Sequence, residues 1–250
     1  MDIEKNKDGA DRRSVLKAVL GTPLLFSAGT LSSPALAQTP LTASGKLTVY
    51  FARHGESEAN VLNVFSNRGV KHPLTIKGYQ QGKTLAEALA RDKIEAIYSS
   101  PITRAVQTAD IIALATNKVV RLAPEIREYD VGVYGDTGSE QGWKIFDEVQ
   151  EAWNRGQPEA KMDGGESLND QKGRFLPFMS RLLAHHGPTG GAIVLVAHSG
   201  IYRNMLPLVF DNIDLKFSMG NKLANASYAK GSFAMAAFTA WSGTVKLSHR

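Results

Sequence analysis

One uninterrupted apolar run constrains the fold of this chain more than any other feature. Residues 192–197 read Ala-Ile-Val-Leu-Val-Ala, without a single polar side chain. A strand that is apolar at every position must be buried on both faces, as in parallel sheets covered by helices on each side. A second short run, residues 47–52, is rich in β-forming residues and predicts another buried strand. The sequence therefore predicts a sheet with two covered faces.

Helical patterns alternate with strand patterns along the rest of the chain. Ser100-Pro101 is typical of a helix start, and Ser167 with Asp170 predicts a variant of the capping box. We expect further strands at 94–98, 119–122, 227–229 and 233–238, helices at 75–90, from 100, at 143–153, 167–185 and 200–210, and a final hairpin around 242–243. This alternation predicts an α/β fold, a three-layer α/β/α sandwich with a mostly parallel central sheet.

The first 37 residues have the pattern of an export signal. Arg12-Arg13 precedes an apolar stretch that runs to about Ala28, and residues 35–37, Ala-Leu-Ala, suit a signal peptidase. The paired arginines resemble a twin-arginine signal. Because the stretch is shorter than the ~20 residues of a membrane span and Pro23 interrupts it, we expect no stable membrane anchor.

The expected organisation follows from that signal. Residues 1–37 are predicted to be a cleaved signal peptide, 38–45 a linker, and 46–250 the folded domain, with an insertion at about 129–165. The protein is then expected to be periplasmic or secreted. Its expected partners in export are the twin-arginine machinery and a signal peptidase.

The composition narrows the chemistry. The chain has no cysteine, which excludes disulfides, thiolate nucleophiles, cysteine zinc sites and iron–sulfur clusters. The formal net charge of +5 is spread without a long basic run. Such a charge suits small anionic substrates and gives no reason to expect nucleic acid binding.

Two of the predicted strands end in histidine. The first continues into Arg53-His54-Gly55, and the later one into His198-Ser199-Gly200. Ligands of open α/β sheets bind outside the carboxyl ends of the strands, so both rings are expected at one edge. Arg104, early in the helix after the strand at 94–98, begins at the same edge. One such histidine is more often structural and one such arginine a solvated charge, but together they predict a site for a dianionic tetrahedral group.

Six segments in order resemble those of the histidine phosphatase superfamily, the phosphoglycerate mutase-like proteins. The resemblance covers about residues 47–210 and implies that fold, with the insertion over the active site. The matching segments are Arg53 to Ser57 with Asn60, Pro73 to Gly78, Ser99 to Thr108, Arg127 to Gly132, Gly164 to Ser167, and Val196 to Gly200.

The resemblance also implies roles. His54 would be the nucleophile that takes up the phosphoryl group, and Glu128 the general acid and base, with Glu125 as the rival carboxylate. The phosphoryl oxygens would be bound by Arg53, Asn60, Arg104, His198 and Ser199, without a metal or a cofactor.

Some positions depart from the family pattern. Where many members carry a phosphate-binding glutamine, this chain has Ser66, with Asn67 adjacent as the other candidate. The segment 133–136 also differs, which affects the substrate pocket. His72 is expected to be solvated and the pair His185-His186 to end a helix. The aromatic residues Trp143, Phe146 and Trp153 are expected to form the insertion core or line a pocket.

The main hypothesis is a metal-independent phosphomonoesterase that hydrolyses small phosphate esters through a phosphohistidine. One alternative is a phosphoglycerate mutase-type phosphotransferase, which the predicted export disfavours. The other is a non-catalytic phosphate-ligand-binding member of the family, which the retention of both histidines disfavours. A serine hydrolase is disfavoured because Ser199 lacks the Gly-x-Ser-x-Gly elbow.

Overall fold

The computed structural model of the chain describes residues 46–233 and 237–241. The predicted signal peptide, the linker and the hairpin around 242–243 lie outside the described residues. Within the described part, no helix combines the length and the apolar character needed to cross a membrane.

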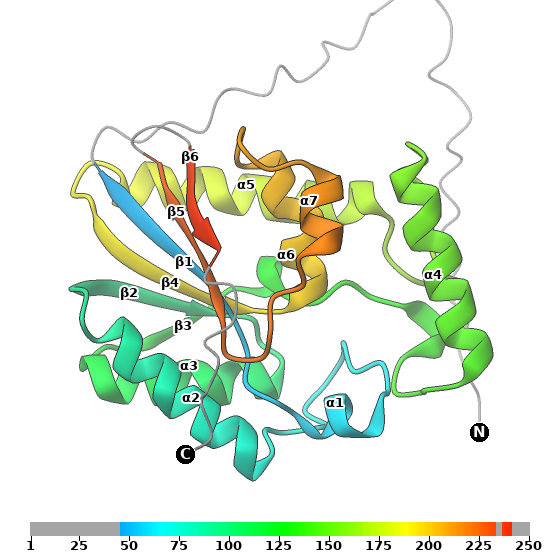
Figure 1. Ribbon diagram of the computed structural model, residues 1–250, viewed down its shortest axis with the longest axis horizontal. Helices are drawn as coiled ribbons and strands as arrows, with labels where there is room; N and C mark the ends of the chain where they lie inside the picture. Colours follow the sequence, from blue (N-terminus) through cyan, green and yellow to red (C-terminus); the bar gives the residue numbers. More distant parts are fainter. Residues whose placement is uncertain (1–45, 234–236, 242–250) are drawn as a thin grey trace, which may run out of the picture. The chain divides into compact units, whose positions relative to one another are not determined.

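The strands of the described part form one sheet of six (Figure 1), ordered β3-β2-β4-β1-β5-β6. They are β1 (Leu47–Arg53), β2 (Ile94–Ser99), β3 (Val120–Leu122), β4 (Gly191–Ala197), β5 (Tyr228–Ser232) and β6 (Ala237–Trp241). The pairs β1–β4, β2–β4 and β2–β3 are parallel, whereas β5 runs antiparallel to both β1 and β6. The predicted mostly parallel sheet is confirmed.

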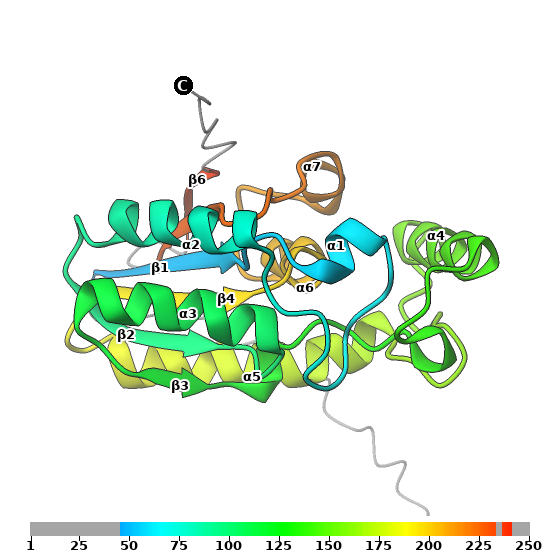
Figure 2. The same ribbon diagram turned by 90° about the horizontal axis from the view of Figure 1, so that it is seen from below.

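Helices cover both faces of this sheet. The helices are α1 (Glu58–Leu62), α2 (Ile76–Leu89), α3 (Thr103–Thr116), α4 (Glu140–Asn154), α5 (Leu168–His186), α6 (Ser199–Met205) and α7 (Leu215–Gly220). Figures 1 and 2 show α2 and α3 together on one side of the sheet and α5 on the other. The three-layer α/β/α prediction is therefore confirmed.

The pleat of β1 explains why its residues are apolar throughout. Tyr50 and Ala52 belong to the core that includes the buried side chains of α2 and α3. Val49 and Phe51 belong to the opposite core, with the buried side chains of α5 and α6. Because neighbouring residues of a strand point to opposite faces, a strand between two helical layers needs apolar side chains at both.

The boundaries differ from the predictions at several points. Helix α3 begins at Thr103 rather than at Pro101, because the backbone of Ile102, its N-cap, is still extended. The Ser100 hydroxyl accepts from the Ile102 N–H at 3.3 Å and lies 2.8 Å from His198 Nε2 in the site. Helix α6 ends at Met205 and continues as a 3₁₀ turn, Leu206–Leu208. The capping box of Ser167 at the start of α5 is confirmed.

A separate aromatic cluster lies beside the carboxyl edge of the sheet, where α4 stands away from both faces (Figure 1). The ring centroids of Phe65, from the loop after α1, and Trp143, from α4, are 4.0 Å apart. Buried Tyr129 and Trp153 complete the contact between α4 and the loops, with ring centroids 5.5 Å apart. This cluster supplies one wall of the cleft described below.

Candidate active site

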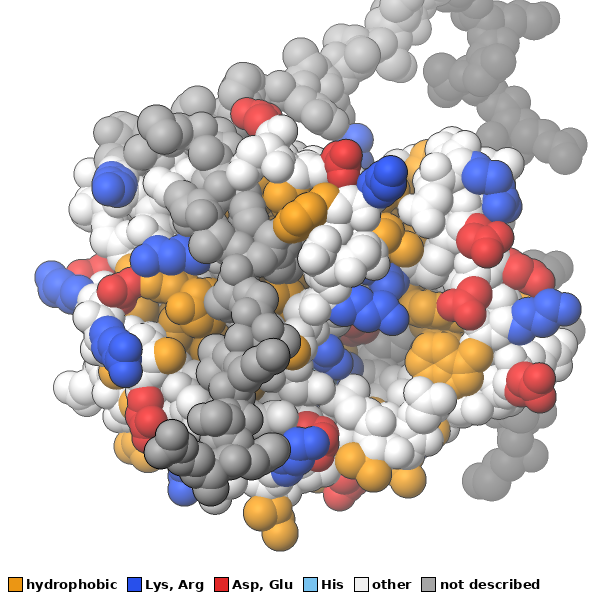
Figure 3. All heavy atoms as spheres, in the orientation of Figure 1, with side chains coloured by type: hydrophobic (Ala, Val, Ile, Leu, Met, Phe, Trp, Pro, Cys, Tyr) orange, Lys and Arg blue, Asp and Glu red, His pale blue; other side chains and the backbone are white. Residues whose placement is uncertain are grey.

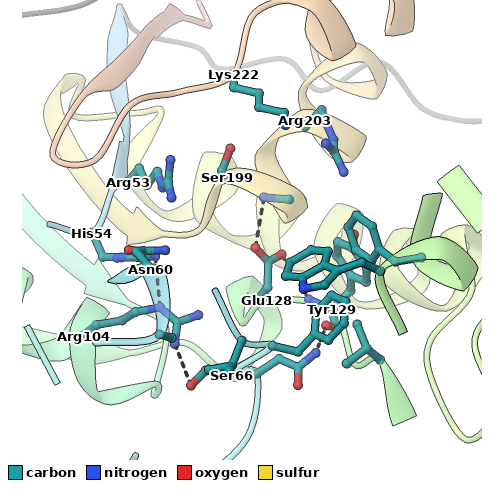
Figure 4. Close-up of a pocket in the computed structure, with 18 residues that line it drawn as sticks. Arg53, His54, Asn60, Ser66, Arg104, Glu128, Tyr129, Ser199, Arg203 and Lys222 are labelled. Atoms are coloured by element: carbon teal, nitrogen blue, oxygen red, sulfur yellow. Dashed lines mark hydrogen bonds between the residues drawn. The ribbon is translucent and has the colours of Figure 1, made fainter. Parts of the chain in front are cut away.

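The carboxyl ends of the parallel strands bring the predicted residues together. Arg53 ends β1, with His54 directly after it, and His198 directly follows β4. Arg104 is the second residue of α3, which follows β2. His54, Arg53 and Arg104 line a cleft of about 250 Å³ (Figure 4), and the buried His198 contacts Arg104.

The contacts of His54 fix its tautomer. Its Nδ1 lies 2.7 Å from the carbonyl oxygen of Gly55, which can only accept a hydrogen bond, so Nδ1 carries the proton. Its Nε2 accepts a hydrogen bond from Arg104 Nε at 3.0 Å. Burial, together with the charges of Arg104 and Arg53, holds the pKa of His54 well below its usual 6.5. The ring is therefore neutral at physiological pH, with its lone pair on Nε2.

His198 is fixed in the opposite tautomer. Its Nδ1 accepts from Arg104 Nη2 at 3.2 Å, and its Nε2 donates to Ser100 Oγ at 2.8 Å. The ring is completely buried, and this burial, with the charge of Arg104, lowers its pKa well below 6.5. The centroids of the two histidine rings are 5.1 Å apart. Two neutral imidazoles thus flank one guanidinium.

The two arginines differ in how they are held. Arg104 donates to both histidines and, at 3.3 Å, to Ser66 Oγ. Burial lowers its pKa to about 10, so it stays charged at neutral pH. Arg53 donates from Nη1 to the carbonyl oxygen of Leu223 at 2.6 Å, while its Nε is buried without a hydrogen-bond partner among the described residues. Arg53 therefore lines the cleft with one guanidinium N–H left unpaired among the described residues.

Glu128 lies in the cleft at the N-terminus of α6. Its carboxylate oxygens accept hydrogen bonds from the backbone N–H groups of Gly200 at 3.0 Å and Ile201 at 2.8 Å. These are donors that the first turn of a helix leaves without partners, and they suit an acidic group. The rival Glu125 instead pairs with Arg181 at 2.7 Å and does not line the cleft. Of the two carboxylates, only Glu128 is near the histidines.

Asn60 presents a donor to the cleft. Its Oδ1 accepts from the backbone N–H of Ser57 at 3.1 Å and from Asn225 Nδ2 at 3.1 Å. Its Nδ2 donates to no partner among the described residues, so this amide N–H₂ group is available to a ligand that lies in the cleft. Ser199, the first residue of α6, also lines the cleft and lies between Arg53 and Glu128 in Figure 4.

Ser66 and Asn67, the two candidates to replace the phosphate-binding glutamine of the family, have different hydrogen-bond partners in the structure. Ser66 Oγ lies 3.3 Å from Arg104 Nη1 and 2.9 Å from His72 Nδ1. Asn67 donates from Nδ2 to the carbonyl oxygen of Tyr129 at 2.6 Å, and its Oδ1 is buried without a partner among the residues that the structure describes. An amide oxygen can only accept, whereas a hydroxyl can also donate to a phosphoryl oxygen. Ser66 is the better donor toward a phosphate.

The remaining histidines and the aromatic residues singled out in the sequence lie in different surroundings. His72 is half-buried and contacts Ser66, so it is not simply solvated as expected. Trp143 and Phe146 line the cleft, whereas Trp153 is buried in the aromatic core. His186, at the end of α5, lies 2.9 Å from the Tyr98 hydroxyl. No cluster of three or more metal-ligating side chains occurs in the described ranges.

Sequence reasoning missed Ser100, Arg203 and Lys222. The sequence pattern indicates a helix cap at Ser100, whereas its hydroxyl accepts a hydrogen bond from His198 Nε2. Arg203 lies four residues after Ser199 on α6, so helical spacing could have placed both on one face. Lys222 follows α7, and no motif around it indicates a site.

The fold and the cleft define an α/β protein in which neutral histidines and buried arginines meet at the carboxyl edge of a mostly parallel sheet. This arrangement suits a tetrahedral anion beside a nucleophilic imidazole. The chain belongs to the histidine phosphatase superfamily (branch 1), whose family model matches residues 49–240.

Its relatives include both mutase-like proteins and phosphatases. The chain is 33% identical over 156 residues to a probable phosphoglycerate mutase GpmB of Proteus mirabilis, covering 61% of this chain and 69% of that one. It is 31% identical to phosphoserine phosphatase 1 of Hydrogenobacter thermophilus, covering 71% of this chain and 82% of that one. Among solved structures, a mycobacterial glucosyl-3-phosphoglycerate phosphatase in complex with VO3 has a TM-score of 0.64 and 26% identity, covering 74% of this chain and 90% of that one.

Proposed function

We propose that this protein is a metal-independent phosphomonoesterase that works through a phosphohistidine on His54. The observation that carries the proposal is the neutral imidazole of His54, whose Nε2 lone pair lies against Arg104 in a cleft that also holds Arg53 and Glu128. An unprotonated nucleophile beside two fixed cations is what phosphoryl transfer to nitrogen requires.

The first step would form the bond between His54 Nε2 and phosphorus. The bond from phosphorus to the ester oxygen breaks, and the leaving oxygen takes a proton from Glu128 to give the alcohol. In the second step a water oxygen attacks phosphorus, the bond to Nε2 breaks, and Glu128 takes the proton from water. Inorganic phosphate leaves, and His54 returns to its neutral form with the proton still on Nδ1.

The surrounding donors would stabilise the charge on the equatorial oxygens. Arg53 Nε and Asn60 Nδ2 are donors without protein partners among the described residues, and Ser66 offers a hydroxyl. Arg104 would transfer its Nε hydrogen bond from His54 to a phosphoryl oxygen when the lone pair attacks. Such preorganised donors are worth about 10²–10³ in kcat for each one removed.

Hydrolysis is favoured over transfer to a second substrate because water can enter the cleft. Figure 3 shows a hollow on this face, with Lys, Arg and hydrophobic side chains around it. The mutase-type reaction, which the name of the Proteus mirabilis relative carries, is the alternative. It requires that the phosphohistidine be protected from water until an acceptor arrives.

Release of inorganic phosphate from p-nitrophenyl phosphate in the presence of a metal chelator tests the proposal. Wild-type protein should release phosphate, and His54→Ala should lose about 10³-fold or more of that activity, because no other nucleophile replaces the ring. His185→Ala is the matched control, since His185 is exposed at the end of α5 and should leave the rate unchanged.

The other outcomes separate the alternatives. Binding of phosphate without turnover by wild-type protein would support the non-catalytic alternative. Turnover that depends on a bisphosphorylated activator, with transfer to a second substrate, would support the mutase. Full activity of His54→Ala would overturn the assigned nucleophile.

A further inference from the structure

A second pair of cations lines the same cleft at a distance from the phosphoryl-binding groups. Arg203 lies on α6, and Lys222 follows α7. Figure 4 places both beyond Ser199, on the side away from His54 and Arg104. The predicted mechanism uses neither of them.

Arg203 is held in place without being neutralised. Its Nη2 donates to Gln150 Oε1 of α4 at 2.5 Å, and Gln150 Nε2 in turn donates to the Tyr129 hydroxyl at 3.0 Å. Burial raises the pKa of Tyr129 far above its usual range, so the phenol is uncharged. Arg203 has no ion pair with a carboxylate among the described residues, and its Nε is buried without a hydrogen-bond partner.

Lys222 adds a second uncompensated charge. Its side chain is exposed at the cleft, and no ion pair or hydrogen bond to it occurs in the part of the chain that the structure describes. A buried, unpartnered donor of a guanidinium is costly, and an anion that accepts from it offsets this cost. Arg203 and Lys222 thus place two cations without carboxylate partners among the described residues in the same cleft.

Aromatic side chains form a further part of the cleft lining. They are Phe65, Trp143 and Phe146, and the rings of Phe65 and Trp143 pack 4.0 Å apart between centroids. These rings suit a flat or apolar part of a ligand. The cleft thus combines phosphoryl-binding groups, aromatic side chains and, beyond Ser199, a pair of cations.

We propose that the substrate carries, besides the phosphate that is cleaved, a second anionic group that binds Arg203 and Lys222. This inference rests on the proposed function, because it assumes that the cleaved phosphate lies between His54 and Arg104. A carboxylate and a second phosphate share the chemistry that the two cations recognise.

Matched esters test the inference. Phenyl phosphate, para-carboxyphenyl phosphate and para-phenylene bisphosphate share one ring and differ only in the second group. Wild-type protein should show a kcat/KM about tenfold higher for at least one of the two doubly anionic esters, mainly through a lower KM. Comparison of the carboxylate with the bisphosphate identifies which anion is preferred.

Variants locate the effect. The double variant Arg203→Gln with Lys222→Gln should lose that tenfold advantage and keep its activity on phenyl phosphate within about twofold. Lys216→Gln, which removes an exposed lysine from α7, is the control for a loss of charge alone and should keep the advantage. An advantage that persists in the double variant, or no advantage in wild type, would overturn the inference.

Binding measurements separate this inference from the catalytic proposal. Benzylphosphonate and para-carboxybenzylphosphonate are not hydrolysed, so calorimetric titration compares their affinities without turnover. Tighter binding of the carboxylated phosphonate to wild type than to the double variant supports the anion site even if no ester is hydrolysed. Equal affinities contradict it even if the protein proves to be a phosphatase.

Discussion

At the scale of single residues, Arg104 holds the two histidine rings of the site in their orientation and helps to keep them neutral. Its three guanidinium nitrogens donate to His54, Ser66 and His198. A lysine could not make these three contacts at once, because the planar fork of donors is specific to arginine. One buried guanidinium therefore aligns both rings and helps to keep both neutral.

Because His54 and His198 are neutral in the folded protein, we expect its stability to depend on pH. Because the pKa values of His54 and His198 are lowered in the folded protein, the unfolded chain takes up protons on these rings at higher pH than the folded protein does. Below about pH 6.5 the unfolded state therefore binds more protons, and the free energy of unfolding should fall as the pH is lowered. Each ring can contribute up to about 1.4 kcal/mol per pH unit.

Urea unfolding between about pH 7.5 and pH 5 measures this slope. His54→Gln removes one of the two titrating rings, so the free energy of unfolding should vary less steeply with pH, by up to about 1.4 kcal/mol per pH unit. His185→Gln should leave this dependence unchanged. An unchanged slope in His54→Gln would show that the ring is not neutral in the folded protein.

At the scale of elements, the site depends on a close crossing between the loop after β1 and the first turn of α2. A Cβ atom on Gly78 would lie 1.9 Å from the carbonyl oxygen of Glu56, and one on Gly55 would lie 2.4 Å from the carbonyl oxygen of Gly78. The Glu56 carbonyl also accepts from the Thr75 N–H at 3.0 Å. The backbone that follows His54 is thus seated directly on α2.

Gly78→Ala should therefore destabilise the protein by about 2 kcal/mol or more and lower kcat, because the loop that carries His54 must shift. Gly173→Ala is the matched control: it lies in α5, no atom lies within 4 Å of the added Cβ, and alanine favours a helix by about 0.5–1 kcal/mol. Thermal unfolding of both variants checks the pair. A neutral Gly78→Ala would contradict the close crossing.

The sequence predicted those elements whose patterns extend over many residues. The buried strands β1 and β4 and the helices α2 and α5 were recognisable because both faces of a covered sheet and one face of a helix must be apolar. The short helices α1 and α7 have too few turns to show a period.

Residues of the site were predictable where they follow a strand and not where they come from a distant loop. His54 and His198 directly follow the two strands that the sequence defines best. Ser100 was misassigned because its hydroxyl hydrogen-bonds a side chain far away in the sequence. Lys222 reaches the cleft only through the path of the chain after α7, which no local pattern encodes.

At the scale of the whole molecule, the function of the N-terminal segment must be considered apart from that of the described domain. The family match begins at residue 49, so it does not extend to the first 48 residues. We propose that residues 1–37 are an export signal that is removed, on the strength of Arg12-Arg13 and the Ala-Leu-Ala sequence at 35–37.

Expression of the full chain in a bacterium with twin-arginine export tests this proposal. The product recovered from the periplasm should begin at Gln38, as determined by mass spectrometry. Replacing both Arg12 and Arg13 by lysine should keep the unprocessed chain inside the cell, whereas Lys5→Gln with Lys7→Gln should be exported normally. Retention of the wild-type chain at full length would contradict the proposed signal.

The hydrogen bond between His54 Nδ1 and the Gly55 carbonyl has a consequence for the chemistry of the covalent intermediate. Imidazole can be phosphorylated at either nitrogen, and the two regioisomers differ in their lability. Since Nδ1 carries the proton and points into the backbone, only Nε2 is open to attack on phosphorus. The trapped intermediate should therefore be τ-phosphohistidine, so one carbonyl group of the backbone would decide which regioisomer the protein makes.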